Sequence, residues 1–561
     1  MSLRSCRWAP GLVLLALLAA CWPSFATTCR SSGECPSGYA CDPESQLCVA
    51  AGLDAGDAGL ADGARDVAAT DSAPRDSAPG DPGHRDLAQA DPGPRDVAAV
   101  DVGLRDATVA DGPAIADANR RDGVVLDAAV GPPPGTFLTL RTTSVSPARF
   151  HPAMTKSGAS LAWHLGDGSP PVQSNVVSHS YLSPGEKTVW VVSSDGVSGI
   201  TRIELGMVST ASTNDLVGPI PAELGDLTNL EYLDLGYNDF SGRIPTALGN
   251  LVDLQELHVN SNQLDGNLPD ELGNLAQLQR LNAGYNRLTG PLPASLGNLT
   301  SLQYLNLGGN QLGGDLPPAL GNLGSLQTLD LYWNQLTGAI PAELGNLSNA
   351  TWIDLHRNLL SGAIPPELGQ LSRLSWLDLN SNQLSGCIPD ELGQLSALSQ
   401  LYLYGNQLSG EIPTALGQLV LLYQLQLQDN QLSGSIPAEL SNLTRVRTID
   451  LSGNQLTGYV PTALGNLATL ETLNLANNQL SGCQPGALAG LAMVNQIHLE
   501  DNGLLQDAVD AIVGEIYANR ASYRPQQKRL YLGGTNAAPG TAALQQIALL
   551  EAGYAWVIDH N

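Results

Sequence analysis

The sequence is poor in aromatic residues, in charged residues and in long apolar runs. Aromatic residues make up 5% of the 561 residues and charged residues 14%. Basic residues are the scarcer charge, with 26 Lys and Arg against 54 Asp and Glu, for a net charge of −28. A chain this acidic is not expected to bind nucleic acid or an anionic lipid surface. Beyond the N-terminal region, no apolar run reaches the ~18 residues that a transmembrane helix needs.

The N-terminus has the pattern of an export signal. Arg4 and Arg7 precede an apolar run at residues 11–20 that is too short to cross a bilayer. The stretch LAAC at residues 18–21 resembles the bacterial lipobox, which is cut before a cysteine that then receives lipid. The resemblance implies that residues 1–20 are removed and that Cys21 is lipidated and forms the only membrane anchor.

Two alternatives for the exported form follow. Trp22, where lipoproteins kept at the inner membrane carry Asp, favours an outer-membrane lipoprotein facing the cell exterior. The stretch Ser24-Phe25-Ala26 also suits an ordinary signal peptidase, and cleavage after Ala26 would release a soluble secreted protein.

Cysteines are few and most of them lie near the N-terminus. Residues 21–48 contain four closely spaced cysteines in a Gly-, Pro- and Ser-rich segment: Cys29, Cys35, Cys41 and Cys48. In an exported protein this pattern predicts a small module with two disulfides and three possible pairings. A zinc site is the alternative, but it favours tighter CxxC pairs.

Residues 49–134 consist mainly of Asp, Ala, Gly and Pro, with Arg-Asp pairs every ten residues from Arg65 to Asp106. This composition cannot bury a core, so we predict a disordered linker. Calcium binding is the alternative, but these carboxylates lack the alternate spacing of a calcium loop.

A longer repeat fills the second half of the chain. Asparagines recur every 24 residues without insertion, at positions 238, 262, 286, 310, 334, 358, 382, 406, 430, 454, 478 and 502. One unit reads LxxLxxLxLxxNxLxGxIPxxLGx, as in the stretch from Leu299 to Gly321. The pattern closely resembles the plant-type class of leucine-rich repeats, marked by Gly-x-Ile-Pro. A fixed period of this length predicts a solenoid over residues 207–504.

The residues of the repeat indicate how each coil folds. Alternating leucines predict a short strand with one face inward, and Gly-x-Ile-Pro turns the chain. The asparagines are expected to bond backbone groups of their own and neighbouring coils. The resemblance implies a right-handed superhelix with a parallel concave β-sheet and a convex side of 3-10 or short helices, preceded by a small β-sandwich and the linker.

Residues 135–206 contain short β-rich runs separated by Gly, Pro and Ser. The stretch WHLGDG at residues 163–168, then HSY at 179–181 and Pro184-Gly185, resembles the polycystic-kidney-disease type domain, although Leu165 stands where Phe is usual. The resemblance implies a β-sandwich that caps the first coil. His164, Asp167 and His179 invite a metal-binding interpretation, but turn and core roles fit the resemblance better.

The C-terminal residues 505–561 predict a helix, a strand, a second helix and a last strand. This order resembles the closing segment of bacterial leucine-rich-repeat proteins, and repeat arrays need such a cap.

The scarce aromatics gather in the middle of the array. In leucine-rich repeats the residues flanking the strand leucines point out from the concave face. The candidate ligand-binding residues are Tyr332, Trp333, Trp352, Asp354, His356, Arg357, Trp376, Asp378, Tyr402 and Tyr404, here called the central patch. Trp, Tyr and Arg are typical interface anchors, so we predict binding of an extracellular protein or polysaccharide, without a cofactor or metal. Stabilisation of the sheet by cross-strand aromatic pairs is the alternative role.

Two other functions remain open. A glycan-degrading enzyme could use Asp330, Asp354 and Asp378, whose carboxylates should lie about 5 Å apart, as in retaining glycosidases. Asp234 and Asp450 occupy the same repeat position away from the aromatics, and an open sheet should not desolvate an acid, so we predict that the protein is not an enzyme. A purely structural envelope spacer is the other alternative. The oligomeric state stays open.

Overall fold

The structure is a computed structural model of the whole chain. It describes residues 132–144, 149–150, 152–157, 160–180, 185–206 and 215–561, together with the backbone of two short strands near the N-terminus. Residues 126–561 form one compact unit and residues 1–125 another. The signal peptide, Cys21, most of the cysteine module and nearly all of the linker lie outside the described residues. No helix among those described is long and apolar enough to cross a bilayer.

The two N-terminal strands are β1 (Tyr39–Cys41) and β2 (Cys48–Ala50). They pair antiparallel, and the register places Cys41 opposite Cys48.

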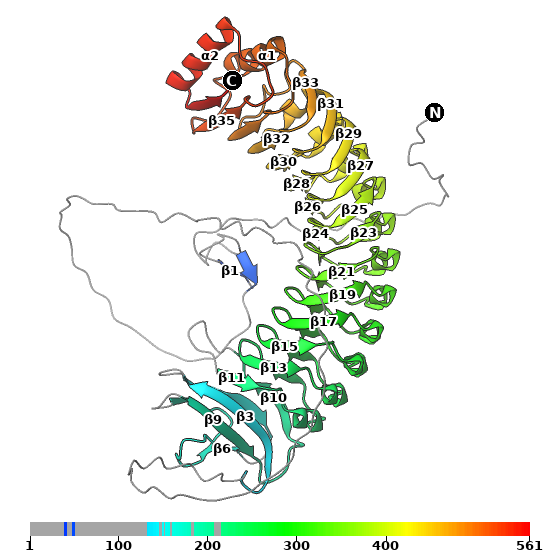
Figure 1. Cartoon of the computed structure of the whole chain (residues 1–561), viewed down its shortest axis with the longest axis vertical. Helices are drawn as coiled ribbons and strands as arrows, with labels where there is room; N and C mark the ends of the chain where they lie inside the picture. Colours follow the sequence, from blue (N-terminus) through cyan, green and yellow to red (C-terminus); the bar gives the residue numbers. More distant parts are fainter. Residues whose placement is uncertain are drawn as a thin grey trace, which may run out of the picture. The chain divides into compact units, whose positions relative to one another are not determined.

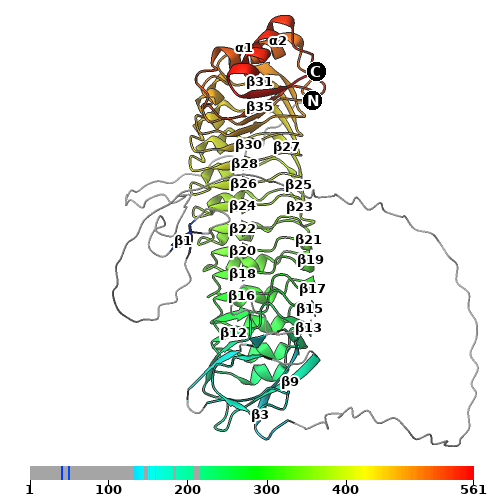
Figure 2. The ribbon, with the colours of Figure 1, turned by 90° about the vertical axis from the view of Figure 1, so that its left-hand side faces the viewer.

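The main unit is built around one long sheet of 16 strands. In spatial order its strands are β36 (Trp556–Asp559), β35 (Lys528–Tyr531), β34 (Gln496–His498), β32 (Thr472–Asn474), β30 (Thr448–Asp450), β28 (Gln424–Gln426), β26 (Gln400–Tyr402), β24 (Trp376–Asp378), β22 (Trp352–Asp354), β20 (Thr328–Asp330), β18 (Tyr304–Asn306), β16 (Arg280–Asn282), β14 (Glu256–His258), β12 (Tyr232–Asp234), β10 (Ile200–Glu204) and β5 (Ala153–Lys156). From β10 to β36 all neighbours are parallel, one strand per coil, as Figure 2 shows.

Two further sheets are formed by the second strands of the coils, and the first of them also includes strands that precede the solenoid. The first contains β21 (Gln335–Thr337), β19 (Gln311–Asp315), β17 (Arg287–Pro291), β15 (Gln263–Gly266), β13 (Asp239–Arg243), β11 (Leu216–Gly218), β3 (Thr136–Ser144), β9 (Gly185–Val192), β6 (Ala162–His164) and β7 (Val172–Gln173). The second contains β23 (Ser361–Gly362), β25 (Gln383–Gly386), β27 (Gln407–Glu411), β29 (Gln431–Ser435), β31 (Gln455–Val460) and β33 (Gln479–Cys483). A separate pair joins β4 (Arg149–Phe150) to β8 (His179–Ser180).

The outer side of each coil is a 3-10 helix of five residues that follows a proline. These helices are η2 (Ala222–Asp226), η3 (Thr246–Asn250), η4 (Asp270–Asn274), η5 (Ala294–Asn298), η6 (Pro318–Asn322), η7 (Ala342–Asn346), η8 (Pro366–Gln370), η9 (Asp390–Gln394), η10 (Thr414–Gln418), η11 (Ala438–Asn442) and η12 (Thr462–Asn466). Figure 1 shows them on the outer side of the curved stack, with the long sheet on the inner side. The predicted solenoid is therefore confirmed.

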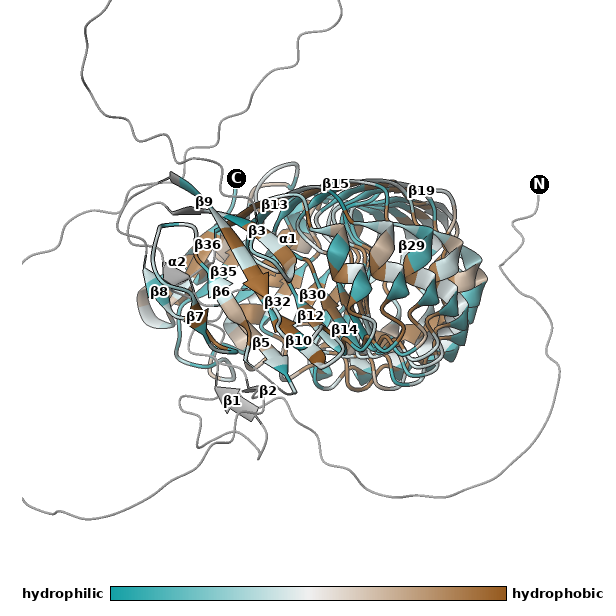
Figure 3. Cartoon of the chain, turned by 90° about the horizontal axis from the view of Figure 1, so that it is seen from below, coloured by the Kyte–Doolittle hydropathy of each residue, from teal (hydrophilic) through white to brown (hydrophobic). Residues whose placement is uncertain are grey.

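Leucines and asparagines hold the coils together. The strand and turn leucines of successive coils are buried in one continuous core, and brown bands recur along the strands in Figure 3. Asn334 donates Nδ2 to the carbonyls of Leu331 in its own coil (3.1 Å) and Leu307 in the previous coil (3.0 Å). Its Oδ1 accepts the backbone N–H of Leu312 at 2.9 Å. The predicted backbone role of the asparagine column is confirmed.

The Leu-Gly pair that all the 3-10 helices except η11 contain reflects close packing between coils. A Cβ atom placed on Gly345 would lie 2.5 Å from the carbonyl oxygen of Glu367 in the next coil. A side chain at Gly345 would push these two outer turns apart, whereas η11 has Ser441 at the equivalent position. Glycine therefore sets the spacing of the convex side.

The N-terminal part of this unit shares its last strand with the solenoid. The β3, β6, β7 and β9 strands form one layer, and β5 pairs antiparallel with β10 in another, with buried side chains of both layers in the common core. Trp163 is fully buried and donates its indole N–H to the carbonyl of Ser174 at 2.9 Å. Strand β10 also pairs in parallel with β12 of the first repeat.

The C-terminal end of the solenoid is closed by two helices and two strands. Helices α1 (Gln506–Ala518) and α2 (Thr541–Gly553) pack against each other, and β35 and β36 extend the long sheet in parallel. Buried residues of both helices belong to the continuous core. The predicted order of helix, strand, helix and strand is confirmed.

Candidate ligand-binding surface

The residues of the central patch lie on, or directly after, four adjacent strands of the long sheet. The register pairs Trp352 with Trp376 and Asp354 with Asp378 on β22 and β24. Between them, Ile353 points into the core and is fully buried. Because side chains alternate along a strand, the tryptophans and aspartates emerge on the concave face in two parallel columns.

The aromatic rings of the patch form two stacks. The rings of Trp352 and Trp376 are nearly parallel, with centroids 4.0 Å apart, and Trp376 contacts Tyr402 at 5.1 Å with a tilt of 56°. The Trp352–Trp376 distance was expected to be about 5 Å from the strand spacing. In the second stack Tyr332 lies parallel to His356 at 5.2 Å, and its hydroxyl donates to that of Tyr285 at 2.9 Å. One flat face of each stacked ring is thus covered by its partner.

Trp333 and Arg357 are the most exposed part of the patch. The Trp333 side chain is 54% exposed, and the Arg357 guanidinium lies 5.5 Å from its ring centroid. Both residues have a left-handed backbone, with φ of 54° and 52°. Bulky residues rarely adopt this conformation, and glycine occupies the same turn position at Gly309 and Gly405.

The carboxyl groups of the patch are more buried than the sequence predicts. Asp354 and Asp378 are each 6% exposed. Burial and, to a smaller extent, the adjacent Asp354 carboxyl together raise the pKa of Asp330 to about 7. Burial likewise raises the pKa of Asp378 to about 6, against the opposing backbone N–H of Asn380. The expectation that an open sheet would not desolvate an acid is therefore wrong, because the side chains around these carboxyl groups leave them little exposed to water.

A structural role for this aspartate column is also visible. Asp354 Oδ1 accepts the backbone N–H of His356 at 3.1 Å, and Asp378 Oδ1 that of Asn380 at 3.0 Å. The same bond occurs outside the patch, where Asp450 accepts the N–H of Ser452 at 3.0 Å. The aspartate thus closes the turn after the strand in several coils, in agreement with its recurrence in the sequence.

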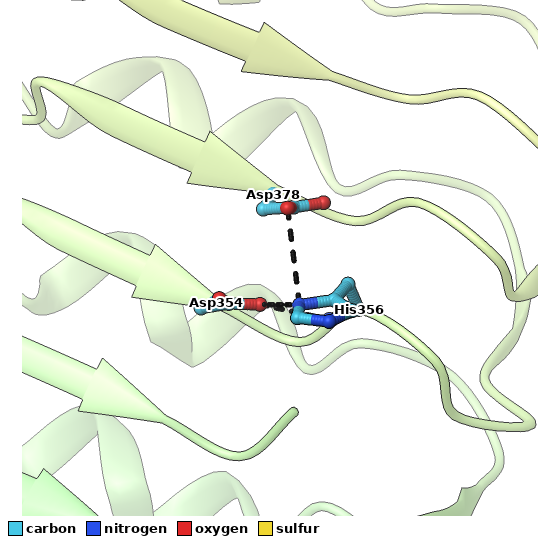
Figure 4. Close-up of side chains that lie close together, drawn as sticks. All are labelled: Asp354, His356 and Asp378. Carbon is cyan, nitrogen blue, oxygen red and sulfur yellow. Dashed lines mark hydrogen bonds and ion pairs between the residues drawn. The ribbon is translucent and has the colours of Figure 1, made fainter. Parts of the chain in front are cut away.

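His356 joins the two aspartates, as Figure 4 shows. Its Nδ1 lies 2.5 Å from Asp354 Oδ1 and 3.8 Å from Asp378 Oδ2. These carboxylates raise the pKa of His356 against the opposing effect of burial. One ligand atom from each of the three residues lies within 4.8 Å of the others, and no other such group of three occurs among the described residues.

Sequence reasoning placed all ten patch residues on one face but misjudged the exposure of three. Trp333 and Arg357 are exposed, while Tyr332, Trp352, His356, Trp376 and Tyr404 are half-buried. Asp354, Asp378 and Tyr402 are buried, which corrects the expectation that they face solvent. Tyr402 is only 9% exposed because it packs on Trp376 and donates its hydroxyl to Gln400 and Gln424.

Asn380 is the residue that sequence reasoning missed. It is 3% exposed and donates Nδ2 to Asp378 Oδ1 at 2.6 Å. It stands 24 residues after His356, at the same repeat position. Comparing His356 with the equivalent residue of the next coil would have found it.

The comparisons with known proteins agree with this architecture. The family described as Leucine-rich repeat region matches residues 213–335, and two families described as Leucine rich repeat match residues 444–504 and residues 325–347, 373–395, 397–419 and 421–443. A leucine-rich repeat protein of Leptospira interrogans is 30% identical, with a TM-score of 0.50 over 62% of this chain and 82% of that chain. The chain therefore belongs to the leucine-rich repeat proteins.

Plant receptors are also similar to the chain. The Arabidopsis receptor kinase HAESA, in complex with the peptide hormone IDA and a co-receptor, is 30% identical, with a TM-score of 0.48 over 60% of each chain. The ectodomain of GASSHO1/SCHENGEN3 from Arabidopsis thaliana is 32% identical, with a TM-score of 0.43 over 62% of this chain and 47% of that chain. The chain thus spans about half to three-fifths of these two receptor chains. No curated protein sequence matches this chain significantly.

Proposed function

We propose that this protein is an exported recognition protein that binds a polypeptide through the central patch. The observation that carries the proposal is the pair Trp333 and Arg357, a large aromatic and a cation held side by side at exposed, left-handed turn positions. The left-handed turn itself recurs along the array, for example at Tyr237 and Tyr285, so the exposed Trp–Arg pairing distinguishes this site rather than the backbone conformation. Trp and Arg are also the residues most enriched at the centre of protein interfaces.

The arrangement of the rings supports a polypeptide rather than a polysaccharide. A sugar ring binds by lying flat on an open aromatic face. Here Trp352 and Trp376 each cover one face of the other, and Tyr332 is stacked on His356, so fewer open ring faces remain for a sugar. Ring edges and an exposed Trp–Arg pair suit the mixed apolar and hydrogen-bonding surface of a peptide.

Selection from a displayed random-peptide library against the full-length protein tests this function. Peptides that bind should lose about 10-fold or more in affinity with Trp333→Ala, as expected for a hot-spot tryptophan. The matched control is Tyr237→Ala, an exposed aromatic at the same left-handed turn position in another coil, with φ of 55°. Equal loss with both variants, or no selected peptide, would contradict the proposal.

A panel of purified glycans should be tested in parallel. Glycan binding that is lost with Trp333→Ala and kept with Tyr237→Ala would establish the polysaccharide ligand instead. Reducing-sugar release from such glycans would show that the buried carboxyl column is catalytic, which we do not expect.

We further propose that the recognition surface is displayed on the cell exterior by a lipid on Cys21. Changing Cys21 to Ser should move the protein from the membrane fraction to the soluble fraction, because no other anchor is predicted. Fractionation with metabolic labelling by a radioactive fatty acid measures this. Label that still enters the Cys21→Ser protein would exclude the lipobox interpretation in favour of another attachment.

A further inference from the structure

We infer that Asp354, His356 and Asp378 form a binding site for a divalent transition metal such as Zn²⁺ on the concave face. The inference is independent of the proposed function. It revises the sequence-based expectation that the protein holds no metal.

The geometry already gathers three ligand atoms. His356 Nδ1 lies 2.5 Å from Asp354 Oδ1 and 3.8 Å from Asp378 Oδ2, and the group fits within 4.8 Å. Ligand atoms around a tetrahedral Zn²⁺, bound at ~2.1 Å, lie about 3–3.6 Å apart. Small side-chain rotations are enough to convert the present cluster into such a set. The proton now on Nδ1 would pass to Nε2 or to solvent, with no redox change.

The cluster is positioned by contacts around it. The backbone N–H of His356 and that of Asn380 each hold one oxygen of an aspartate, and the ring of Tyr332 lies parallel to the imidazole at 5.2 Å. Hydrogen bonds and packing of this kind orient ligands in metal sites. Two buried carboxylates here face a single imidazole, and the Arg357 guanidinium is directed to Trp333. A divalent cation would balance their charge.

The side-chain oxygen of Asn380, which lacks a hydrogen-bond donor within the described part of the chain, is a second and separate indication that a ligand binds here. Its Nδ2 is bonded to Asp378 Oδ1 at 2.6 Å, so the amide lies against the cluster. Its Oδ1 is buried and has no hydrogen-bond partner among the described residues. Buried amide oxygens almost always accept a hydrogen bond. A water bound to the metal would be such a donor.

The choice of metal follows from the ligand types. An imidazole nitrogen with two carboxylates suits Zn²⁺, which accepts three protein ligands and an open fourth position. Ca²⁺ requires about six to eight oxygen ligands, which this cluster does not offer. The combination is also particular to these coils, because elsewhere on the sheet His258 pairs with Glu256 and His498 with Glu500 without forming a group of three.

Isothermal titration of ZnCl₂ into the untagged, EDTA-treated full-length protein tests the inference. The wild type should bind one more Zn²⁺ per chain than His356→Ala. Both proteins contain the N-terminal cysteines, so zinc bound there cancels when the two stoichiometries are subtracted. Asp378→Asn should weaken this site strongly, and Asn380→Ala about 10-fold, as for a residue that orients a ligand. His498→Ala, which removes a histidine with one carboxylate partner, should bind as the wild type does.

Thermal unfolding separates loss of the site from loss of the fold. In EDTA the His356→Ala and Asp378→Asn proteins should retain a cooperative transition, and ZnCl₂ should raise the midpoint of the wild type only. Equal zinc stoichiometry in the wild type and His356→Ala, equal loss in His498→Ala, or CaCl₂ binding in place of ZnCl₂ would each overturn the inference. None of these results would alter the test of peptide binding with Trp333→Ala.

Discussion

Trp333 and Arg357 show how single residues of the patch depart from the repeat. Each coil turns at this position with a left-handed residue, and Gly309, Gly405 and Gly453 meet the requirement without strain. Trp333 and Arg357 meet it with bulky side chains, as Tyr237 and Tyr285 do in coils outside the central patch.

Replacing Trp333 by Gly should therefore stabilise the protein while it weakens peptide binding. We expect a gain of up to about 1 kcal/mol in the free energy of unfolding, because the left-handed conformation is disfavoured by about 1–2 kcal/mol for a residue with a Cβ. Part of the gain is lost with the Arg357 contact. Unfolding in guanidinium measures the change in the free energy of unfolding. Trp333→Ala, which keeps the Cβ, is the control. A less stable Trp333→Gly protein would show that the Trp333 side chain contributes to folding.

The raised pKa of Asp330 lets us predict how the stability of the protein depends on pH. Its folded pKa of about 7 lies above the ordinary value of 3.8, so the folded state holds a proton that the unfolded state releases. Its contribution to stability is therefore complete below pH 3.8 and is lost as the pH rises through about 7.

The Asp330→Asn protein cannot ionise at this position and should lack that part of the fall in unfolding midpoint between pH 3.8 and about 7. Differential scanning calorimetry in EDTA measures both proteins. Asp450→Asn is the matched control in the same column, where Asp450 accepts hydrogen bonds from Ser452 and Asn474, and it should lower the midpoint at every pH. Parallel pH profiles for wild type and Asp330→Asn would contradict the raised pKa.

At the scale of elements, the asparagine column connects the strands to the outer turns. Asn334 bonds four backbone groups in its own and the previous coil, three of them in the buried interior. Each coil repeats these bonds with its own asparagine, so the column fixes the register that aligns the patch residues.

Replacing Asn334 by Ala should lower the free energy of unfolding by about 2–4 kcal/mol, because several buried backbone groups lose their partners. Hydrogen exchange should show the loss of protection at the Leu312 amide, which Asn334 accepts at 2.9 Å. Asn346→Ala, at an exposed position of η7, should change stability by less than about 0.5 kcal/mol. Comparable losses in both variants would refute the role of the column.

At the scale of the molecule, the chain divides into two compact units, residues 1–125 and residues 126–561. All the residues of the continuous apolar core lie between Leu138 and Ile558, within the unit of residues 126–561. The unfolding of this unit should therefore not depend on the Asp- and Ala-rich segment that precedes it.

A protein that lacks residues 65–114 should unfold with the same calorimetric midpoint and enthalpy as the full chain. The deletion removes no residue of the described core. A protein that lacks residues 505–561 is the informative contrast, because it exposes the last coil and should melt earlier. If the first deletion lowers the midpoint of the solenoid, residues 65–114 contribute to folding and the linker interpretation is wrong.

The sequence by itself determined the coils, their number and the two columns of the concave face. Its period of 24 residues has no insertion, so each residue lies beside its equivalent in the next coil, and strand alternation decides which side chains share a face. For this reason Trp352 and Trp376 could be placed together without a structure. The backbone bonds of the asparagines follow from the same local repetition.

Only the tertiary structure decided how the side chains within those columns interact. Whether Asp378 turns to His356 or to Asn380, and how far Tyr402 is covered by Trp376, depends on rotamers and on the sizes of neighbours 22 to 26 residues away. The repeat pattern of the sequence does not determine these rotamers or how the neighbouring side chains pack. The burial of Asp354 and Asp378 and their cluster with His356 likewise depend on how the surrounding side chains pack.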